Sequence, residues 1–224
     1  MYQSIRNGKL LYHSTLIYNV PSITCDGLYS RSIIESNNYN FCDIADHNIL
    51  DGRQNLSYDL PQFVPFHFFP RTPFEKSICQ SQGTENIAII SIYRPNRDEM
   101  RSYKVAPAHP LSKYNKGIFS YEDGIKKIDW DTLDDYDKNY NNYTYDNYVH
   151  NAVMAECLVP EMVMPKDIAF IYVSSENAKN RILDELNQMY MPYSLNIYNK
   201  ITVNANMFPK LYNCQSRFST YKKY

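Results

Sequence analysis

The chain has 224 residues and a net charge of −1, and 44% of its residues are hydrophobic. This length fits one folded domain, which we expect to span residues 1–224, and the near-neutral charge excludes a protein that binds nucleic acid through its overall charge. No apolar run is long enough to cross a membrane and the first residues lack the apolar core of a signal peptide, so we expect a cytoplasmic protein with no membrane partner.

The first predicted elements are a strand, a polar turn and a short helix. Leu10–His13 is an apolar strand that leads into the pair Ser14–Thr15. Residues 19–26 then predict a helix, with Asn19 as a capping residue and Gly27 as its stop. Small polar side chains and free N–H groups at such a place suit a ligand with phosphates or hydroxyls, although turns of this kind are common.

The next part of the chain predicts a helix, a strand, a second helix and a second strand. Residues 44–50 suggest a short helix, and Arg53 beyond it is either a solvated cation or a fork for phosphate or carboxylate. Phe63–Pro70 is an aromatic strand that ends at a proline turn, and the helix after it extends to about Ser81. Asn86–Tyr93 is a nearly continuous apolar run, which predicts a central strand.

The middle of the chain has weaker patterns. Residues 94–115 suggest a loop, and residues 117–119 suggest a short strand. The acid-rich segment that starts at Asp129 predicts a helix, because acidic residues favour a helix start without any metal. Residues 139–148 alternate Tyr and Asn, so we expect an exposed segment that contacts a substrate.

One carboxylate stands out within an apolar segment. Residues 151–160 contain mostly apolar residues around Glu156, and they predict a strand closed by a proline. Burying a charged carboxylate is unfavourable unless it is paired, so a buried Glu156 needs a partner or a function. From these residues alone, a glutamate on an edge strand facing water is an equally good alternative.

The last predicted elements decide the fold class. Ile168–Val173 predicts a strand, Ser175 caps a helix with an apolar face, and short strands are expected near 195–198 and at Ile201–Val203. Strands outnumber helices and do not alternate with them regularly, which favours an α+β architecture.

The metal-ligating residue types form no recognisable site. The five cysteines and five histidines are scattered, and none has the spacing of a zinc knuckle or of a pair on one helix face. We therefore expect free thiols in a reducing compartment and no metal.

Several blocks of the chain occur in an order that resembles one family. Leu11–Ile23 reads Leu-Tyr-His-Ser-Thr-Leu-Ile-Tyr-Asn-Val-Pro-Ser-Ile, and Phe63–Pro73 reads Phe-Val-Pro-Phe-His-Phe-Phe-Pro-Arg-Thr-Pro. Arg53-Gln54-Asn55 lies between them, and Ile128–Trp130 and Ala155–Val159 follow. This arrangement resembles the DarT-type ADP-ribosyltransferases, toxins that attach ADP-ribose from NAD to bases of single-stranded DNA.

The resemblance implies a fold and a set of site residues. The fold is the ADP-ribosyltransferase fold, with two packed, mainly antiparallel sheets, surrounding helices and an NAD cleft. NAD is the co-substrate, and no metal takes part. The implied catalytic residues are Glu156 and Arg53, the NAD-binding residues are His13, Ser14, Thr15, Ser22, Tyr29 and Arg53, and the nucleic-acid-binding residues are Arg71, Phe74, Tyr145 and Tyr148.

These residue types fit the chemistry. As nicotinamide leaves, the anomeric carbon becomes oxocarbenium-like, and a carboxylate such as Glu156 can bind the ribose and stabilise the positive charge. Arg53 stays protonated, so it suits an electrostatic or positioning role better than that of a base. The Tyr-rich segment before Glu156 corresponds to a substrate-recognition loop, where stacking contributes about 1–3 kcal/mol per base.

The acceptor half departs from the family pattern. Where thymidine-modifying members have Thr-Asp-Arg-His after a Val-Phe strand, we align Ser120–Asp123, and Phe74 replaces the usual Met. We expect transfer of ADP-ribose to a base of single-stranded DNA, by the toxin of a toxin–antitoxin or phage-defence system. The expected partners are the nucleic acid and an antitoxin, which the resemblance implies is a macrodomain glycohydrolase. The alternatives are RNA or protein as acceptor, NAD hydrolysis, or a silent module that only binds NAD or nucleic acid.

Overall fold

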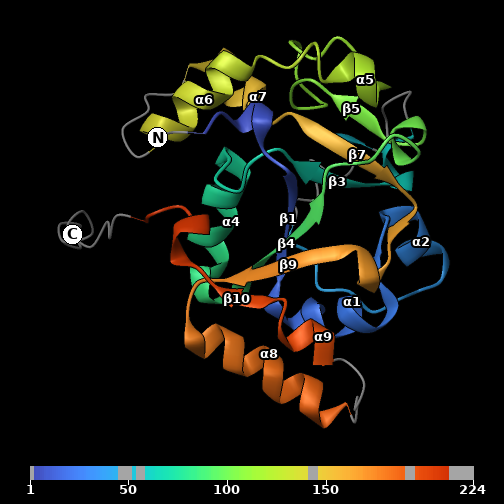
Figure 1. Ribbon diagram of the computed structural model, residues 1–224, viewed down its shortest axis with the longest axis vertical. Coiled ribbons are helices and arrows are strands. Elements are labelled where there is room, and N and C mark those ends of the chain that lie inside the picture. Colours follow the sequence, from blue (N-terminus) through green and yellow to red (C-terminus); the bar gives the residue numbers. More distant parts are fainter. Residues whose placement is uncertain (1–2, 45–51, 54–58, 141–145, 190–194, 212–224) are drawn as a thin grey trace, which may run out of the picture.

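The structure is a computed structural model, and it describes residues 3–44, 52–53, 59–140, 146–189 and 195–211. Its centre is an eight-stranded sheet with the strand order β10-β9-β4-β1-β3-β7-β5-β6, shown in Figure 1. All pairs are antiparallel except β9 and β10, which run parallel. A second, two-stranded sheet pairs β2 with β8. The expected α+β fold with mainly antiparallel sheets is confirmed.

The first half of the large sheet contains the long apolar strands. These are β1 (Leu10–Leu16), β4 (Ile87–Tyr93), β9 (Ile168–Val173) and β10 (Ile201–Val203). β4 lies between β1 and β9, and every residue of it except Tyr93 is buried. A strand covered on both faces needs apolar residues at successive positions, which explains why β4 lacks alternation.

The second half of the sheet holds the strands around Glu156. These are β3 (Phe63–His67), β7 (Glu156–Pro160), β5 (Lys104–Ala106) and β6 (Phe119–Ser120). Among the described residues, a single ladder pair joins the two halves, between Tyr12 of β1 and His67 of β3. The large sheet therefore consists of two four-stranded halves that part from one another on either side of a single bridge.

The small sheet lies directly after the first helix in the chain. It pairs β2 (Leu28–Tyr29) with β8 (Met162–Val163). Gly27 between the first helix and β2 has φ +111°, and a Cβ there would stand 2.8 Å from the carbonyl oxygen of Val163. Only glycine fits this close approach without strain.

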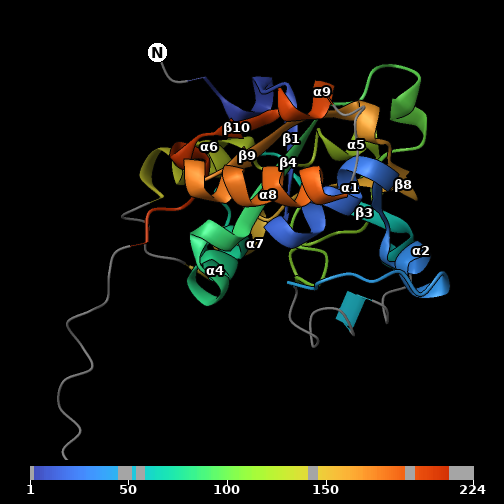
Figure 2. The ribbon, with the colours of Figure 1, turned by 90° about the horizontal axis from the view of Figure 1, so that it is seen from below.

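Helices cover both faces of the large sheet, as Figure 2 shows. Near the N-terminus are α1 (Val20–Asp26) and α2 (Arg31–Ser36), and α4 (Pro73–Gln82) follows β3. The segment between β5 and β7 forms α5 (Tyr121–Gly124), α6 (Trp130–Asn139) and α7 (Asn147–Ala152), and the C-terminal part forms α8 (Glu176–Gln188) and α9 (Leu195–Tyr198).

Side chains cap the starts of several helices, as predicted for α8 at Ser175. Ser175 accepts a hydrogen bond from the N–H of Ala178 at the start of α8, and Asp129 accepts one from Thr132 in α6. Thr72 and Glu75 form a capping box at the start of α4. These contacts satisfy N–H groups that a helix start otherwise leaves unpaired.

Several local predictions were wrong. Ser14 and Thr15 continue β1 instead of forming a turn, and Asn19 makes no side-chain cap because its Oδ1 accepts the N–H of Cys42 at 3.1 Å. Residues 195–198 form the helix α9 instead of a strand. The predicted loop of residues 94–115 contains β5. Most of the expected helix at residues 44–50 lies outside the described residues.

Candidate active site

A cavity opens beside the junction of the two half-sheets. It encloses about 1140 Å³ of empty space, a volume that includes the open solvent at its mouth. Its lining is mostly apolar, with side chains such as Leu28, Ile34, Phe41 and Phe63. The polar residues of the lining include His13, Arg53, His67, His109 and Glu156.

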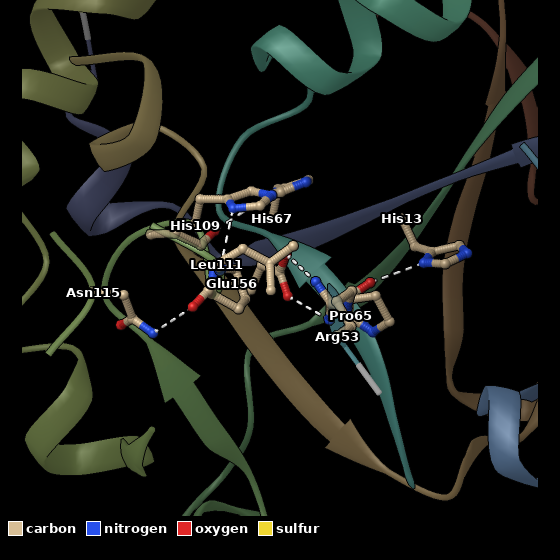
Figure 3. Close-up of polar contacts among 10 residues, drawn as sticks. His13, Arg53, Pro65, His67, His109, Leu111, Asn115 and Glu156 are labelled. Atoms are coloured by element: carbon tan, nitrogen blue, oxygen red, sulfur yellow. Dashed lines mark hydrogen bonds and ion pairs between the residues drawn. The ribbon is translucent and has the colours of Figure 1, made fainter. Parts of the chain in front are cut away.

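Glu156 and Arg53 form a bidentate ion pair in this lining. Arg53 Nη1 donates to Glu156 Oε1 at 2.8 Å, and Nη2 donates to Oε2 at 2.9 Å, as Figure 3 shows. The side chains of Arg53 and Glu156 are only 14% and 5% exposed. Glu156 begins β7, which lies between β3 and β5, so the alternative of an edge-strand glutamate facing water is wrong.

The pair fixes the charge of both groups. Burial alone would raise the pKa of Glu156, but the charge and hydrogen bonds of Arg53 outweigh it and lower that pKa below its ordinary value. Burial would likewise lower the pKa of Arg53, and the Glu156 carboxylate outweighs that effect and raises it. Glu156 is therefore an ionised carboxylate and Arg53 a permanent cation, so Arg53 has no lone pair with which to act as a base.

His13 is held in its neutral form. Burial lowers its pKa to about 4, against the opposing effect of a hydrogen bond to the Pro65 carbonyl. That bond joins Nδ1 to the carbonyl oxygen at 2.8 Å, so Nδ1 carries the proton. Because the neutral ring has only one proton, Nε2 is an acceptor. His13 thus lines the cavity as a hydrogen-bond acceptor that stays uncharged near neutral pH.

Two further histidines near Glu156 were missed from the sequence. His67 pairs directly with Glu156 across β3 and β7, and its Nδ1 donates to the Ala155 carbonyl at 3.2 Å. His109 follows β5, and its Nδ1 accepts the N–H of Leu111 at 3.3 Å. Burial lowers the pKa of His109, so its neutral ring keeps an N–H at Nε2.

The positions of these histidines explain why they were missed. His67 could have been found from the register of β3 against β7, whereas His109 lies between loop prolines with no pattern to mark it. Ser120–Asp123, where we expected the acceptor segment without a histidine, forms the start of α5, and Asp123 is exposed. The histidine on this side of Glu156 is His109.

The two polar residues that follow His13 have internal partners. Ser14 lines the cavity and donates to Glu75 Oε1 at 3.1 Å, and Glu75 also accepts from the N–H and hydroxyl of Thr72. Thr15 is 1% exposed and accepts from Asn19 Nδ2 at 3.0 Å. The structure thus places Ser14 at the cavity and keeps Thr15 within the protein beside it.

The remaining residues predicted to bind NAD differ in position. Tyr29 lines the cavity, and its ring lies against that of Tyr39 with centroids 5.3 Å apart. Ser22 is exposed on α1, donates to the Asn19 carbonyl and is not part of the cavity lining. Arg31 lines the cavity although the sequence did not single it out, and it forms an ion pair with Asp43.

The residues predicted to bind nucleic acid are also spread out. Phe74 lines the cavity with its ring 6.2 Å from that of His67. Arg71 lies outside the cavity lining, where it pairs with Asp137 and stacks over Tyr140 at 4.7 Å. Tyr148 is 42% exposed on α7, and Tyr145 lies outside the described residues.

The described residues contain neither a metal-binding cluster nor a helix that could span a membrane. Within residues 3–44, 52–53, 59–140, 146–189 and 195–211, no group of three or more His, Cys, Asp or Glu could hold a metal ion. In the same parts of the chain, no helix has the length and apolar character required to cross a membrane.

The fold and the site together define a class of enzyme. Two mainly antiparallel half-sheets that part beside an open cavity, with a buried ionised glutamate at the junction, are the arrangement of an ADP-ribosyltransferase. Residues 12–208 match the model of the family described as "ssDNA thymidine ADP-ribosyltransferase, DarT". The chain belongs to this DarT family.

Individual relatives agree with the family match. The chain is 27% identical over 190 residues to a DNA ADP-ribosyl transferase–DNA ADP-ribosyl glycohydrolase fusion protein of Thermosipho africanus, covering 81% of this chain and 47% of the relative. The structure of Thermosipho africanus DarTG in complex with ADP-ribose matches with a TM-score of 0.72 and 25% identity, over 90% of this chain and 51% of that one. The chain thus spans about half the length of these relatives.

A more distant structure shares the fold over its whole length. Thermus sp. 2.9 DarT, solved in complex with NAD+ and with ADP-ribosylated ssDNA, matches with a TM-score of 0.69 and 17% identity. The match covers 93% of this chain and 100% of that chain.

Proposed function

We propose that the chain transfers ADP-ribose from NAD to a thymidine base of single-stranded DNA. The observation that carries this proposal is the buried Arg53–Glu156 pair at the wall of an open, mostly apolar cavity, in a chain of the DarT family. The apolar lining suits the adenine and nicotinamide rings, and the few convergent polar groups suit the sugars and phosphates. NAD is the co-substrate in this proposal.

Glu156 acts on the ribose that carries nicotinamide. The bond between the anomeric carbon and the nicotinamide nitrogen breaks, and its electron pair leaves with nicotinamide. The carbon left behind is oxocarbenium-like, and a fixed, ionised carboxylate in a partly dehydrated site stabilises its charge. A nitrogen of the base then attacks that carbon and loses its proton, and we assign the acceptance of this proton to Glu156.

Arg53 and His13 position the substrates. Arg53 uses one N–H of each terminal nitrogen on Glu156, so its remaining N–H groups are available to the phosphates of NAD. His13 presents its Nε2 acceptor, which suits a donor such as a ribose hydroxyl or the amide of nicotinamide. We propose Ser14 and Tyr29 as further NAD contacts, with Thr15 supporting Ser14 through the strand that they share.

The biological setting is part of the same proposal. The Thermosipho africanus relative joins its transferase to a DNA ADP-ribosyl glycohydrolase. We propose that this chain is the toxin of a toxin–antitoxin pair, that it acts in the cytoplasm, where NAD and DNA are both available, and that a glycohydrolase antitoxin removes the modification. Expression of the chain alone should arrest growth, and co-expression of such a glycohydrolase should restore it.

Separate acceptors test the activity. NAD labelled in its adenylate is incubated with the protein and with single-stranded DNA, double-stranded DNA, RNA or protein, and Glu156→Gln serves as the matched inactive variant. We expect label on single-stranded DNA with the wild-type chain only. Label on protein or RNA alone, or release of free ADP-ribose without any labelled polymer, would contradict the proposed acceptor.

A further inference from the structure

Two tyrosines outside the catalytic pair contact each other, one exposed and one half-buried. Tyr114, in the loop after β5, and Tyr148, on α7, lie with ring centroids 5.3 Å apart and an interplanar angle of 88°. We propose that these two residues, which we name the aromatic platform, stack a base that flanks the acceptor thymidine in single-stranded DNA. The inference rests on the proposed function and extends it to the recognition of a neighbouring nucleotide.

The two rings have different parts in the platform. Tyr148 is 42% exposed, so its ring is accessible to a base. Its hydroxyl donates to Asp129 Oδ2 at 2.7 Å, which anchors the far end of the side chain. Tyr114 is half-buried and meets Tyr148 edge to face. A ring anchored at its hydroxyl and supported by a second ring loses little freedom when a base stacks on it, which favours binding.

The charges around the platform separate bases from phosphates. Lys113 is exposed, and its Nζ lies 5.1 Å from the centre of the Tyr114 ring. This cation attracts a phosphate on the Tyr114 side of the platform. On the Tyr148 side, the carboxylates of Asp129 and Asp146 disfavour phosphates. The uncharged face of a base is therefore the part of the nucleic acid that fits Tyr148.

Both tyrosines are connected to the catalytic pair. The N–H of His109 donates to the Asn151 carbonyl of α7 at 2.9 Å, so the loop that carries Tyr114 is joined to the helix that carries Tyr148. Figure 3 shows the course of this loop through His109, Leu111 and Asn115, close to Glu156.

The same loop also rests on the segment that carries Arg53. A Cβ placed on Gly52 would lie 3.0 Å from Leu111, which shows that Leu111 packs directly on that segment. Asn115 Nδ2 donates to the Pro110 carbonyl at 3.2 Å and closes the turn before Lys116. The loop that carries Tyr114 is therefore held against the helix that carries Tyr148 and against the residue before Arg53.

Binding without NAD gives the first test. A fluorescent thymidine-containing oligonucleotide is titrated with the wild-type chain and with Tyr148→Ala, Tyr148→Phe and Tyr114→Ala. Tyr93→Ala is the matched control, because Tyr93 is 61% exposed at the end of β4 and lies outside the cavity lining.

The loss of base stacking sets the expected change in oligonucleotide affinity for each variant. Tyr148→Ala should bind roughly 10-fold more weakly or worse, and Tyr148→Phe, which keeps the ring, should stay within about 3-fold of wild type. Tyr114→Ala should fall between them, and Tyr93→Ala should bind as wild type does. Lys113→Ala should reduce the slope of log affinity against log salt by about 0.7. Equal binding by all tyrosine variants would overturn the inference.

Abasic substrates give the second and sharper test. Transfer to an oligonucleotide with intact flanks is compared with transfer to one whose flanking bases are removed. Wild type should lose about 10-fold in kcat/KM for the oligonucleotide, mainly through KM, on the abasic substrate. Tyr148→Ala should already show that loss and lose little more, because the two changes remove the same contact. Its KM for NAD should be unchanged.

The two proposals fail in different ways. If wild type modifies no oligonucleotide, the proposed acceptor is wrong. If wild type modifies DNA and Tyr148→Ala remains as sensitive to the abasic flank as wild type, the acceptor stands and the aromatic platform is wrong.

Discussion

The buried ion pair predicts that the effects of two mutations on stability are not additive. Glu156→Gln keeps the shape of the side chain and removes its charge, so Arg53 keeps a guanidinium that is 14% exposed and has lost its counter-ion. Removing one partner of a buried pair costs about 3–5 kcal/mol. Because the cavity lets water reach Arg53, we expect the lower end, about 3 kcal/mol. For a domain of this size that lowers the Tm by about 6–12 °C.

The double variant decides whether this reasoning holds. In Arg53→Met with Glu156→Gln both charges are absent, so no buried charge remains unpaired and most of the loss should be recovered. We expect a coupling free energy of about 2–3 kcal/mol between the two positions. Chemical or thermal unfolding of the two single variants, the double variant and the wild type, all without NAD, measures it.

An exposed ion pair provides the control for this cycle. Lys126 and Asp123 lie 3.4 Å apart with side chains that are 69% and 63% exposed. Such pairs contribute about 0–1 kcal/mol, so Lys126→Met should change the Tm by no more than about 3 °C. If the effects of the Arg53 and Glu156 variants simply add, or if each is as small as that of Lys126→Met, the reasoning from burial is refuted.

Three further predictions concern other parts of the chain. Gly124→Ala should destabilise the protein by about 1–3 kcal/mol, measured by urea unfolding, because its Cβ would stand 2.4 Å from Cβ of the buried Val105. Ser175→Ala should cost about 1 kcal/mol through loss of the α8 cap, and Ser175→Asp should not recover it, because its carboxylate would lie against Glu85, which accepts the Ser175 hydroxyl at 2.6 Å. The pKa of His13 is about 4 in the folded chain and about 6.5 in the unfolded chain. The contribution of neutral His13 to the free energy of unfolding is therefore complete above pH 6.5 and is lost as the pH falls toward 4. Because the ring is only half-buried, we expect roughly 2 kcal/mol, seen as a smaller pH dependence of unfolding in His13→Gln.

The long apolar strands could be predicted from the sequence because their burial determines their composition. β4 is a run of buried Ile and Ala with one buried Ser, and β9 is an apolar run of Ile, Ala, Phe, Tyr and Val that buries Ile168, Ile171 and Val173. β5 and β6 have only three and two residues, too few for any period to show, and the pairing of β5 with β7 and of β6 with β5 is decided by tertiary contacts. α9 has four residues, and its apolar residues suit a strand as well as a helix turn.

The catalytic pair could be predicted only through the order of the family motifs. Arg53 and Glu156 are 103 positions apart, and no local pattern indicates that they meet. The fold brings them together because β7 lies at the centre of its half-sheet and its first residue faces the cavity. His109 shows the limit of the motif order, because the loop after β5 reaches the cavity from a segment that the sequence did not associate with the site.

Mass spectrometry of a defined oligonucleotide tests the central claim most directly. A single-stranded DNA that contains one thymidine is incubated with NAD and either the wild-type chain or Glu156→Gln. We predict one ADP-ribose on that thymidine with the wild type, and a yield lower by at least about 100-fold with Glu156→Gln, since removing one such electrostatic contact costs about that much in rate. An unmodified oligonucleotide with the wild type, or equal modification by both proteins, would contradict the account.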